Sequence, residues 1–252
     1  MEAASLAVGI ASLATVFNNA VECFEYVQLG RSLGTNFQTS VLKLDNARLR
    51  LSRWGSSVGL SGHIDATKSL QSTILPPEAV PKAEQLLGHI VKLFTDAEHY
   101  AAQFKKPDDH GLLVQDLQTD LNPVVASLHQ KMRELSIRRQ NGMPLSKKIK
   151  WALYDERRLK ELIDSITGLT NDLVSLFPAV KEQEQLLCNE EVSEFSESFR
   201  ILKKVAEGQD EILAAALSDL LKPVARTNEW NNYSSKVGVQ QDSNTGTITL
   251  TF

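Results

Sequence analysis

The sequence predicts an all-α protein: a helical bundle over residues 1–222, followed by a short β-prone or disordered tail over residues 223–252. Apolar residues recur at steps of three and four through most of residues 3–222, as in helices that bury one face. Breaks rich in Gly, Pro or Ser separate these stretches, and no repeat of solenoid length is present. Charged residues thin out after residue 227, where Asn, Ser, Thr, Gln and Gly dominate.

The first predicted helix, Ala3–Val27, opens with nineteen residues that carry no charged side chain. Its opposite face is polar and holds Ser12, Asn18, Asn19, Glu22 and Glu25. The large or apolar positions lie on one side of the helix: Leu6, Ile10, Leu13, Phe17, Ala20, Phe24 and Val27. This pattern fits both a helix of a soluble bundle and a short membrane-crossing helix.

Residues 1–27 are a candidate latent membrane segment, with only marginal affinity for lipid, and equally a candidate helix of a soluble bundle. Nineteen helical residues span about 28 Å, just short of a hydrocarbon core of roughly 30 Å. The candidate insertion residues each favour transfer by about 0.3 to 0.6 kcal/mol, and neighbouring polar residues nearly cancel the sum. These candidates are Leu6, Val8, Ile10, Leu13, Val16, Phe17 and Val21. Small residues that would let several copies pack closely are Ser5, Ala7, Gly9, Ala11 and Thr15. No Lys or Arg precedes Arg31, which argues against a secretion signal.

Capping residues and breaks predict the later helices. One helix begins near Phe37 and stops at Gly55, with Arg48 at a position that is otherwise apolar. Asp155 is predicted to cap a helix that Pro178 ends. The remaining predicted helices cover approximately residues 81–104, 112–121, 124–140, 186–205 and 210–222.

No catalytic, cofactor or metal site is predicted. The five histidines share no ligand spacing with one another or with Cys23 and Cys188, and no phosphate-binding glycine loop is present. A net charge of −4 argues against a nucleic-acid partner. Two cysteines provide no disulfide framework, which favours a reducing, cytoplasmic setting.

Charge is segregated along the chain. Lys131–Lys160 holds ten basic residues, whereas Glu182–Glu197 holds six glutamates and no base. Three interpretations remain open: two solvated faces, pairing between the segments within the bundle or across a dimer, and recruitment of anionic lipid. The candidate lipid contacts are Arg138, Arg139, Lys147, Lys148 and Lys150.

The tail contains two pieces of alternating sequence, separated by a turn at residues 242–246. A two-stranded hairpin is marginal on its own, but low charge and the absence of proline suit stacking into cross-β structure. The candidate amyloid residues are Val237, Val239, Asn244, Gly246, Ile248 and Leu250. A disordered tail is the alternative.

Four collinear segments resemble fungal HeLo domains, the globular part of the HET-s/HET-S heterokaryon-incompatibility family. They are FNNAVECFEYVQLGR at residues 17–31, LDNARLRLSRWG at 44–55, SIRRQ at 136–140 and KKIKWALYD at 147–155. The resemblance covers roughly residues 1–222 and implies a helical bundle, often dimeric, that shelters its N-terminal segment.

The resemblance also implies a function. In toxic family members an amyloid-forming tail is templated by a matching fibril, and the helical domain then inserts its N-terminal segment into the plasma membrane and oligomerises. We therefore expect a non-enzymatic, pore-forming executor of cell death whose partners are itself, membrane lipids and an amyloid-bearing protein or receptor. Ser32 stands where a non-toxic member carries proline, which favours the toxic type. The alternatives are a non-toxic prion-type member and a soluble helical adaptor that binds a partner protein.

Overall fold

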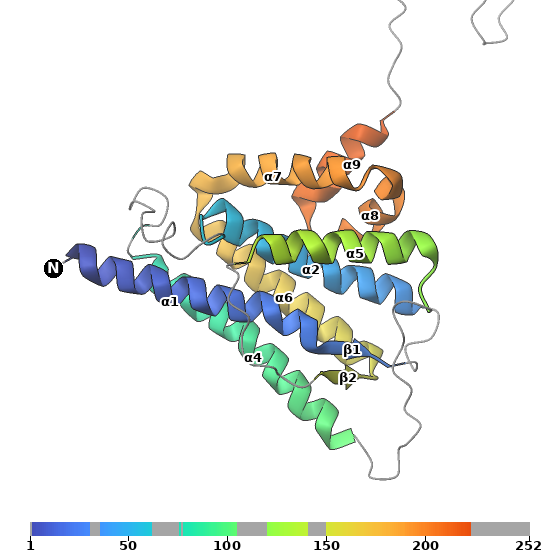
Figure 1. The fold of residues 1–252 in the computed structure, drawn as a ribbon, viewed down its shortest axis with the longest axis horizontal. Helices are drawn as coiled ribbons and strands as arrows, with labels where there is room; N and C mark the ends of the chain where they lie inside the picture. The colour runs from blue at the N-terminus through green and yellow to red at the C-terminus, as the bar shows by residue number, and fades with distance from the viewer. Residues whose placement is uncertain are drawn as a thin grey trace, which may run out of the picture. The chain divides into compact units, whose positions relative to one another are not determined.

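The computed structural model describes residues 2–30, 36–61, 76, 78–104, 120–140 and 150–222, with the side chains of residues 2–8, 10, 104 and 179 left out. The predicted all-α bundle is confirmed, and Met1–Leu221 forms one compact unit (Figure 1). The tail candidates, Ser32, Lys147 and Lys148 lie outside the described residues. The helices are α1 (Glu2–Glu22), η1 (Cys23–Tyr26), α2 (Phe37–Ser57), α4 (Val80–Phe104), α5 (Pro123–Arg138), α6 (Glu156–Leu176), η3 (Pro178–Val180), α7 (Lys181–Glu194), η4 (Ser196–Ser198), α8 (Phe199–Ala206) and α9 (Glu211–Leu221).

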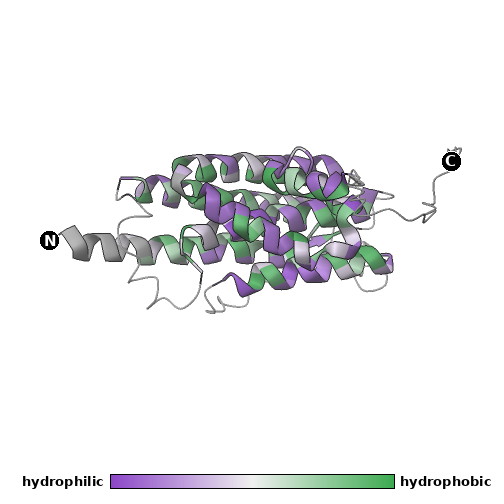
Figure 2. Cartoon of the chain, turned by 90° about the horizontal axis from the view of Figure 1, so that it is seen from above, coloured by the Kyte–Doolittle hydropathy of each residue, from purple (hydrophilic) through white to green (hydrophobic). Residues whose placement is uncertain are grey.

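Helix α2 is the central element of the bundle. It packs against α1, α5, α6, α7 and α8, and all of its residues from Val41 to Ser57 except Lys43 and Ser56 are buried. Each described helix carries both hydrophobic and hydrophilic residues along its length, as Figure 2 shows. The hydrophobic positions meet in one continuous core that includes residues of every α-helix.

Helices α1, α4 and α6 lie along one side of α2. Helix α1 runs beside α4, which in turn packs on α6. A short parallel sheet joins the end of this group: β1 (Val27–Leu29) pairs with β2 (Trp151–Leu153), with Val27 opposite Trp151. Helical periodicity did not predict these strands, because three residues are too few to show an alternating pattern.

Several predicted boundaries are confirmed. Asp155 caps α6 by accepting hydrogen bonds from the backbone N–H groups of Arg157 and Arg158, and α6 ends before Pro178. Asn122 caps α5, with Pro123 in the first turn. Most of the helix expected over residues 112–121 lies outside the described residues.

Two predicted boundaries are wrong. The first helix does not continue to Val27, because the backbone tightens into η1 after Glu22 and then extends into β1. Helix α2 does not stop at Gly55 but continues to Ser57, and the left-handed residue that follows is Gly59, with φ of 78°. Gly55 instead lies inside the helix, against the ring of Phe17 in α1.

A buried charge cluster joins α2 to the C-terminal helices. The Arg53 guanidinium donates to both oxygens of Glu191 in α7, at 2.9 and 2.7 Å, and to both oxygens of Asp210 before α9, at 3.2 and 2.6 Å. Burial alone would lower the pKa of Arg53, but the two carboxylates outweigh it and raise that pKa. Since each charge is paired, this part of the bundle resists opening.

Candidate functional site

Helix α1 buries its apolar face inside the bundle. The side chains of Leu13, Phe17 and Val21 are fully buried, and Val16 is half-buried. These are the four insertion candidates whose side chains the structure describes; Leu6, Val8 and Ile10 lie on the same helix, but their side chains are outside the description. The described residues that we predict to insert into the membrane are therefore also residues that pack in or against the folded core.

Phe17 is the deepest contact between α1 and α2. Its ring meets Trp54 edge-on, with the ring centroids 6.2 Å apart, and Trp54 in turn contacts Phe177. Phe17 also lies directly over Gly55, where a Cβ atom would come within 2.1 Å of Phe17 Cζ. Glycine at position 55 thus allows the ring to touch the helix backbone.

The outer face of α1 remains accessible. Thr15 is exposed, and its hydroxyl donates only along the helix, to the backbone oxygen of Ala11 at 2.9 Å. Ala11 and Gly9 are half-buried, and Ser12 donates to Glu84 of α4 at 2.6 Å. Of the five predicted small packing residues, Ser5 and Ala7 fall outside the described side chains.

Charged groups hold the link between α1 and β1. Glu25 of η1 accepts hydrogen bonds from Arg133 of α5, at 2.9 and 3.2 Å from Nε and 2.6 Å from Nη2, and also from Arg48 of α2. Burial by itself would raise the pKa of Glu25, but the two guanidinium groups outweigh it and lower that pKa. We call Glu25, Arg48 and Arg133 the Glu25 cluster.

A second pair lies beside the Glu25 cluster. His129 of α5 meets Asp45 of α2, with Nδ1 and Oδ2 separated by 2.7 Å. Burial alone would lower the pKa of His129, but the hydrogen bond and charge of Asp45 outweigh it and raise that pKa. Burial also raises the pKa of Asp45. The hydrogen bond between these two side chains therefore links α2 to α5.

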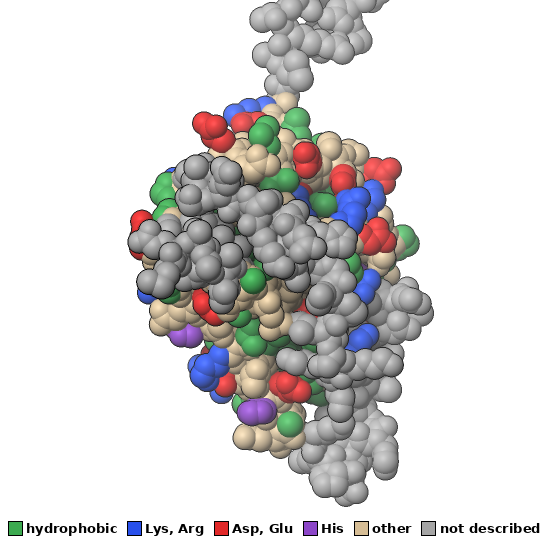
Figure 3. All heavy atoms as spheres, turned by 60° about the vertical axis from the view of Figure 1, so that its left-hand side comes forward, with side chains coloured by type: hydrophobic (Ala, Val, Ile, Leu, Met, Phe, Trp, Pro, Cys, Tyr) green, Lys and Arg blue, Asp and Glu red, His purple; other side chains and the backbone are tan. Residues whose placement is uncertain are grey.

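The basic candidates do not form one lipid-facing group. Arg139 is buried and donates to Glu191 at 2.5 Å, so in this fold it has no access to a lipid surface. Arg138 is exposed but pairs with Glu194 at 2.9 Å, and Lys150 is exposed. The interpretation in which basic and acidic segments pair within the bundle is thus observed at Arg138 and Arg139. On the face that Figure 3 shows, described acidic and basic side chains lie side by side.

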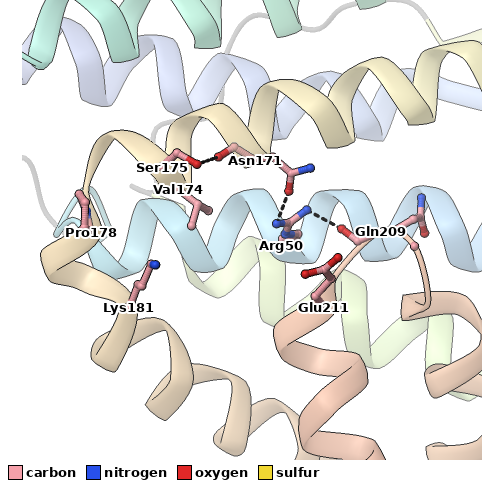
Figure 4. Close-up of a pocket in the computed structure, with 9 residues that line it drawn as sticks. Arg50, Asn171, Val174, Ser175, Pro178, Lys181, Gln209 and Glu211 are labelled. Carbon is pink, nitrogen blue, oxygen red and sulfur yellow. Dashed lines mark hydrogen bonds between the residues drawn. The ribbon is translucent and has the colours of Figure 1, made fainter.

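A polar cavity of about 410 Å³ lies between α2, α6, α7 and the start of α9 (Figure 4). At its floor, Arg50 donates to the backbone oxygen of Gln209 and, at 2.5 Å, to Asn171. Its mouth carries Lys181 and Glu211, which are of opposite charge. No lining residue of this cavity belongs to α1, so the cavity is separate from the site of the first helix.

Two features of the described residues bear on the chemistry of the site. Within the ranges that the structure describes, no helix is both long enough and apolar enough to cross a membrane. In the same ranges, His, Cys, Asp and Glu side chains do not gather into a group suited to a metal ion.

Sequence reasoning did not identify the Glu25 cluster. Glu25 was placed on the polar side of a continuous helix, but the change to η1 turns its carboxylate toward α2 and α5. The available signal was Arg48, which occupies an apolar position in the helical pattern of α2. A charged residue at such a position is buried and needs a counter-charge.

Comparison with known proteins gives consistent matches. A family model described as HeLo, prion-inhibition and propagation, matches residues 5–205. Heterokaryon incompatibility protein S of Podospora anserina is 34% identical over 221 residues, which is 87% of this chain and 75% of that protein. Heterokaryon incompatibility protein s of the same fungus is 32% identical over 222 residues, with the same coverage.

Solved structures agree with these sequence matches. The HET-s N-terminal domain superposes with a TM-score of 0.73 at 33% identity, covering 82% of this chain and 95% of that one. A mutant form of that domain gives a TM-score of 0.72 at 33% identity, covering 82% and 97%.

Proposed function

Because this chain belongs to the HeLo family of prion-inhibition and propagation domains, we propose that it acts in fungal heterokaryon incompatibility as a membrane-targeted executor of cell death. The inactive protein is cytoplasmic and associates as a homodimer. An amyloid-bearing partner or receptor templates the tail, and this event releases α1 from the bundle. Released helices from several copies then assemble into a pore at the plasma membrane.

The proposal rests on one observation: the apolar face of α1 that packs in the bundle core is also suited to contact lipid. Leu13, Phe17 and Val21 are fully buried in the bundle, although Ala3–Val21 contains no charged residue that would oppose transfer into lipid. A helix with this composition can enter a hydrocarbon environment at little net cost, because its apolar and polar residues nearly balance. Folding therefore keeps α1 out of the membrane until the bundle opens.

Clustering supplies the free energy that a single copy lacks. One copy of α1 inserts weakly, because its polar residues offset the apolar ones. Ala11 and Thr15 are four residues apart on the less buried side of α1, and small residues at this spacing allow membrane helices to approach closely. Insertion is therefore expected to depend steeply on protein concentration.

The decisive variant is Thr15→Lys. Replacing Leu13 or Phe17 by Lys should also abolish leakage, but both side chains are fully buried, so those variants disturb the folded protein as well. Thr15 is exposed in the bundle, so a lysine there leaves the core intact. In a bilayer, that lysine costs about 2.5 to 3.5 kcal/mol near the helix centre, enough to prevent insertion.

The experiment measures dye release from anionic liposomes, with and without seed fibrils made from residues 227–252. The parent protein should release dye when seeded, and Thr15→Lys should release little. The matched control is Thr95→Lys, since Thr95 is an exposed threonine of α4 whose hydroxyl makes the same bond one turn back, to Val91. Equal leakage by Thr15→Lys and the parent would contradict the proposal, and so would sealed vesicles with every seeded protein.

A further inference from the structure

We propose that the Glu25 cluster is the latch that keeps α1 in the bundle, so that release of α1 and rupture of the Glu25–Arg48 ion pair are one event. This inference concerns the regulation of the site proposed above and rests on that function. It arises from three observations: the position of Glu25 in the chain, the anchoring of β1, and the burial of Arg48.

The chain beyond Glu25 is firmly anchored. Strand β1 pairs with β2, and the Gly30 N–H donates to the Leu153 carbonyl at 2.9 Å. Tyr154 closes over Gly30 so tightly that a Cβ atom there would lie 2.0 Å from its ring. With β1 held in place, α1 can leave the bundle only if the backbone pivots between α1 and β1. That stretch is η1, which carries Glu25.

Arg48 makes this pivot costly. Its side chain is only 4% exposed, and Glu25 accepts a hydrogen bond from its Nη1. Its Nε and Nη2 atoms are buried and have no hydrogen-bond partner within the described residues. If η1 swings out, the Arg48 charge stays buried in α2 without its hydrogen-bonded carboxylate and keeps only the longer-range attraction of Asp45. An unpaired buried charge is far less favourable than a solvated one.

The two arginines that pair with Glu25 differ in how deeply they are buried. The Arg133 side chain is 37% exposed, so water can solvate its guanidinium when Glu25 leaves. Arg48 has no such access. The ion pair with Arg48 therefore sets the cost of opening, while the hydrogen bonds from Nε and Nη2 of Arg133 fix the orientation of the carboxylate.

Hydrogen exchange of the full chain in solution, read by mass spectrometry, tests the latch without a membrane. In Glu25→Gln, peptides covering residues 11–26 should exchange roughly 10- to 100-fold faster, because a hydrogen bond to a charged group is lost. Peptides covering α7 should keep the parent rate. Glu134→Gln is the matched control: it removes the same charge from an exposed residue of α5, whose carboxylate accepts a hydrogen bond from Gln130.

A second variant tests the contribution of the Glu25–Arg48 ion pair. Glu25→Gln combined with Arg48→Met removes both the carboxylate and the stranded cation, and should return residues 11–26 to within about threefold of the parent rate. The latch is overturned by any of three results: parent-like exchange of α1 in Glu25→Gln, equal acceleration throughout the chain, or a double variant as fast as Glu25→Gln alone. If the parent fails to release dye while these exchange results hold, the membrane function fails and the latch stands.

Discussion

The ring of Phe17 rests on the backbone of Gly55, where any larger residue would place its Cβ atom within 2.1 Å of Phe17 Cζ. This contact joins the first helix to the central helix at a point where the Phe17 ring leaves no space for a side chain at position 55. A substitution at position 55 therefore tests how tightly α1 packs against α2.

Gly55→Ala should loosen α1 although alanine favours helix. Overpacking of a buried contact costs about 1 to 3 kcal/mol, more than the gain of up to about 1 kcal/mol from helix propensity. We expect the free energy of unfolding, measured by urea denaturation, to fall by about 1 to 2 kcal/mol. Gly88→Ala and Gly168→Ala are the controls, since a Cβ atom at either position meets nothing within 4 Å. Those variants should be as stable as the parent or more so; a stabilising Gly55→Ala would contradict the contact.

The Asp45–His129 pair should make stability depend on pH near neutrality. The pKa of His129 is higher in the folded protein than its ordinary value of 6.5, so the stabilisation is fully present below pH 6.5 and is lost as the pH rises through the folded value. The charged groups that act on it are Asp45 of α2 and Glu25 of η1, which support protonation, and Arg133 of α5, which opposes it.

The measurement is the free energy of unfolding of the parent and of His129→Gln between about pH 6 and pH 8, the range in which histidine titrates. The parent should lose stability as the pH increases across this range, and His129→Gln should show a flatter profile. Identical slopes in the two proteins would show that the pair does not titrate as described.

The boundaries and faces of the helices follow from local chemistry, which is why they could be predicted. Asp155 is a side-chain cap, Pro178 cannot continue a helix, and the spacing of Leu13, Phe17 and Val21 defines a buried stripe. Each of these signals lies within a few residues of its effect.

The missed features depend on partners far away in the chain. Glycine at position 55 resembled a helix stop because Phe17, whose ring requires it, lies in another helix. Arg139 belonged to a basic stretch, and only the fold brings it to Glu191. The strands β1 and β2 stabilise each other across more than a hundred residues, so neither shows a pattern by itself.

The tail should form amyloid by itself if it acts as the trigger. A peptide of residues 227–252 should convert to thioflavin-positive fibres, because its alternating residues carry little charge and no proline. The same peptide with Ile248→Pro should convert much more slowly, since proline removes a hydrogen-bond donor from the stack. A parent peptide that stays monomeric at high concentration would remove the tail from the mechanism.

The central claim is that α1 exchanges the bundle interior for lipid, and a fluorophore on its exposed face reports this most directly. In Thr15→Cys, labelled with a polarity-sensitive dye while Cys23 and Cys188 are buried, the dye begins in water. On seeding with anionic liposomes, the account predicts a blue-shifted emission that nitroxide-labelled lipids quench, whereas the same dye in Thr95→Cys is not quenched. Vesicles that leak while the dye at position 15 stays in water would contradict it.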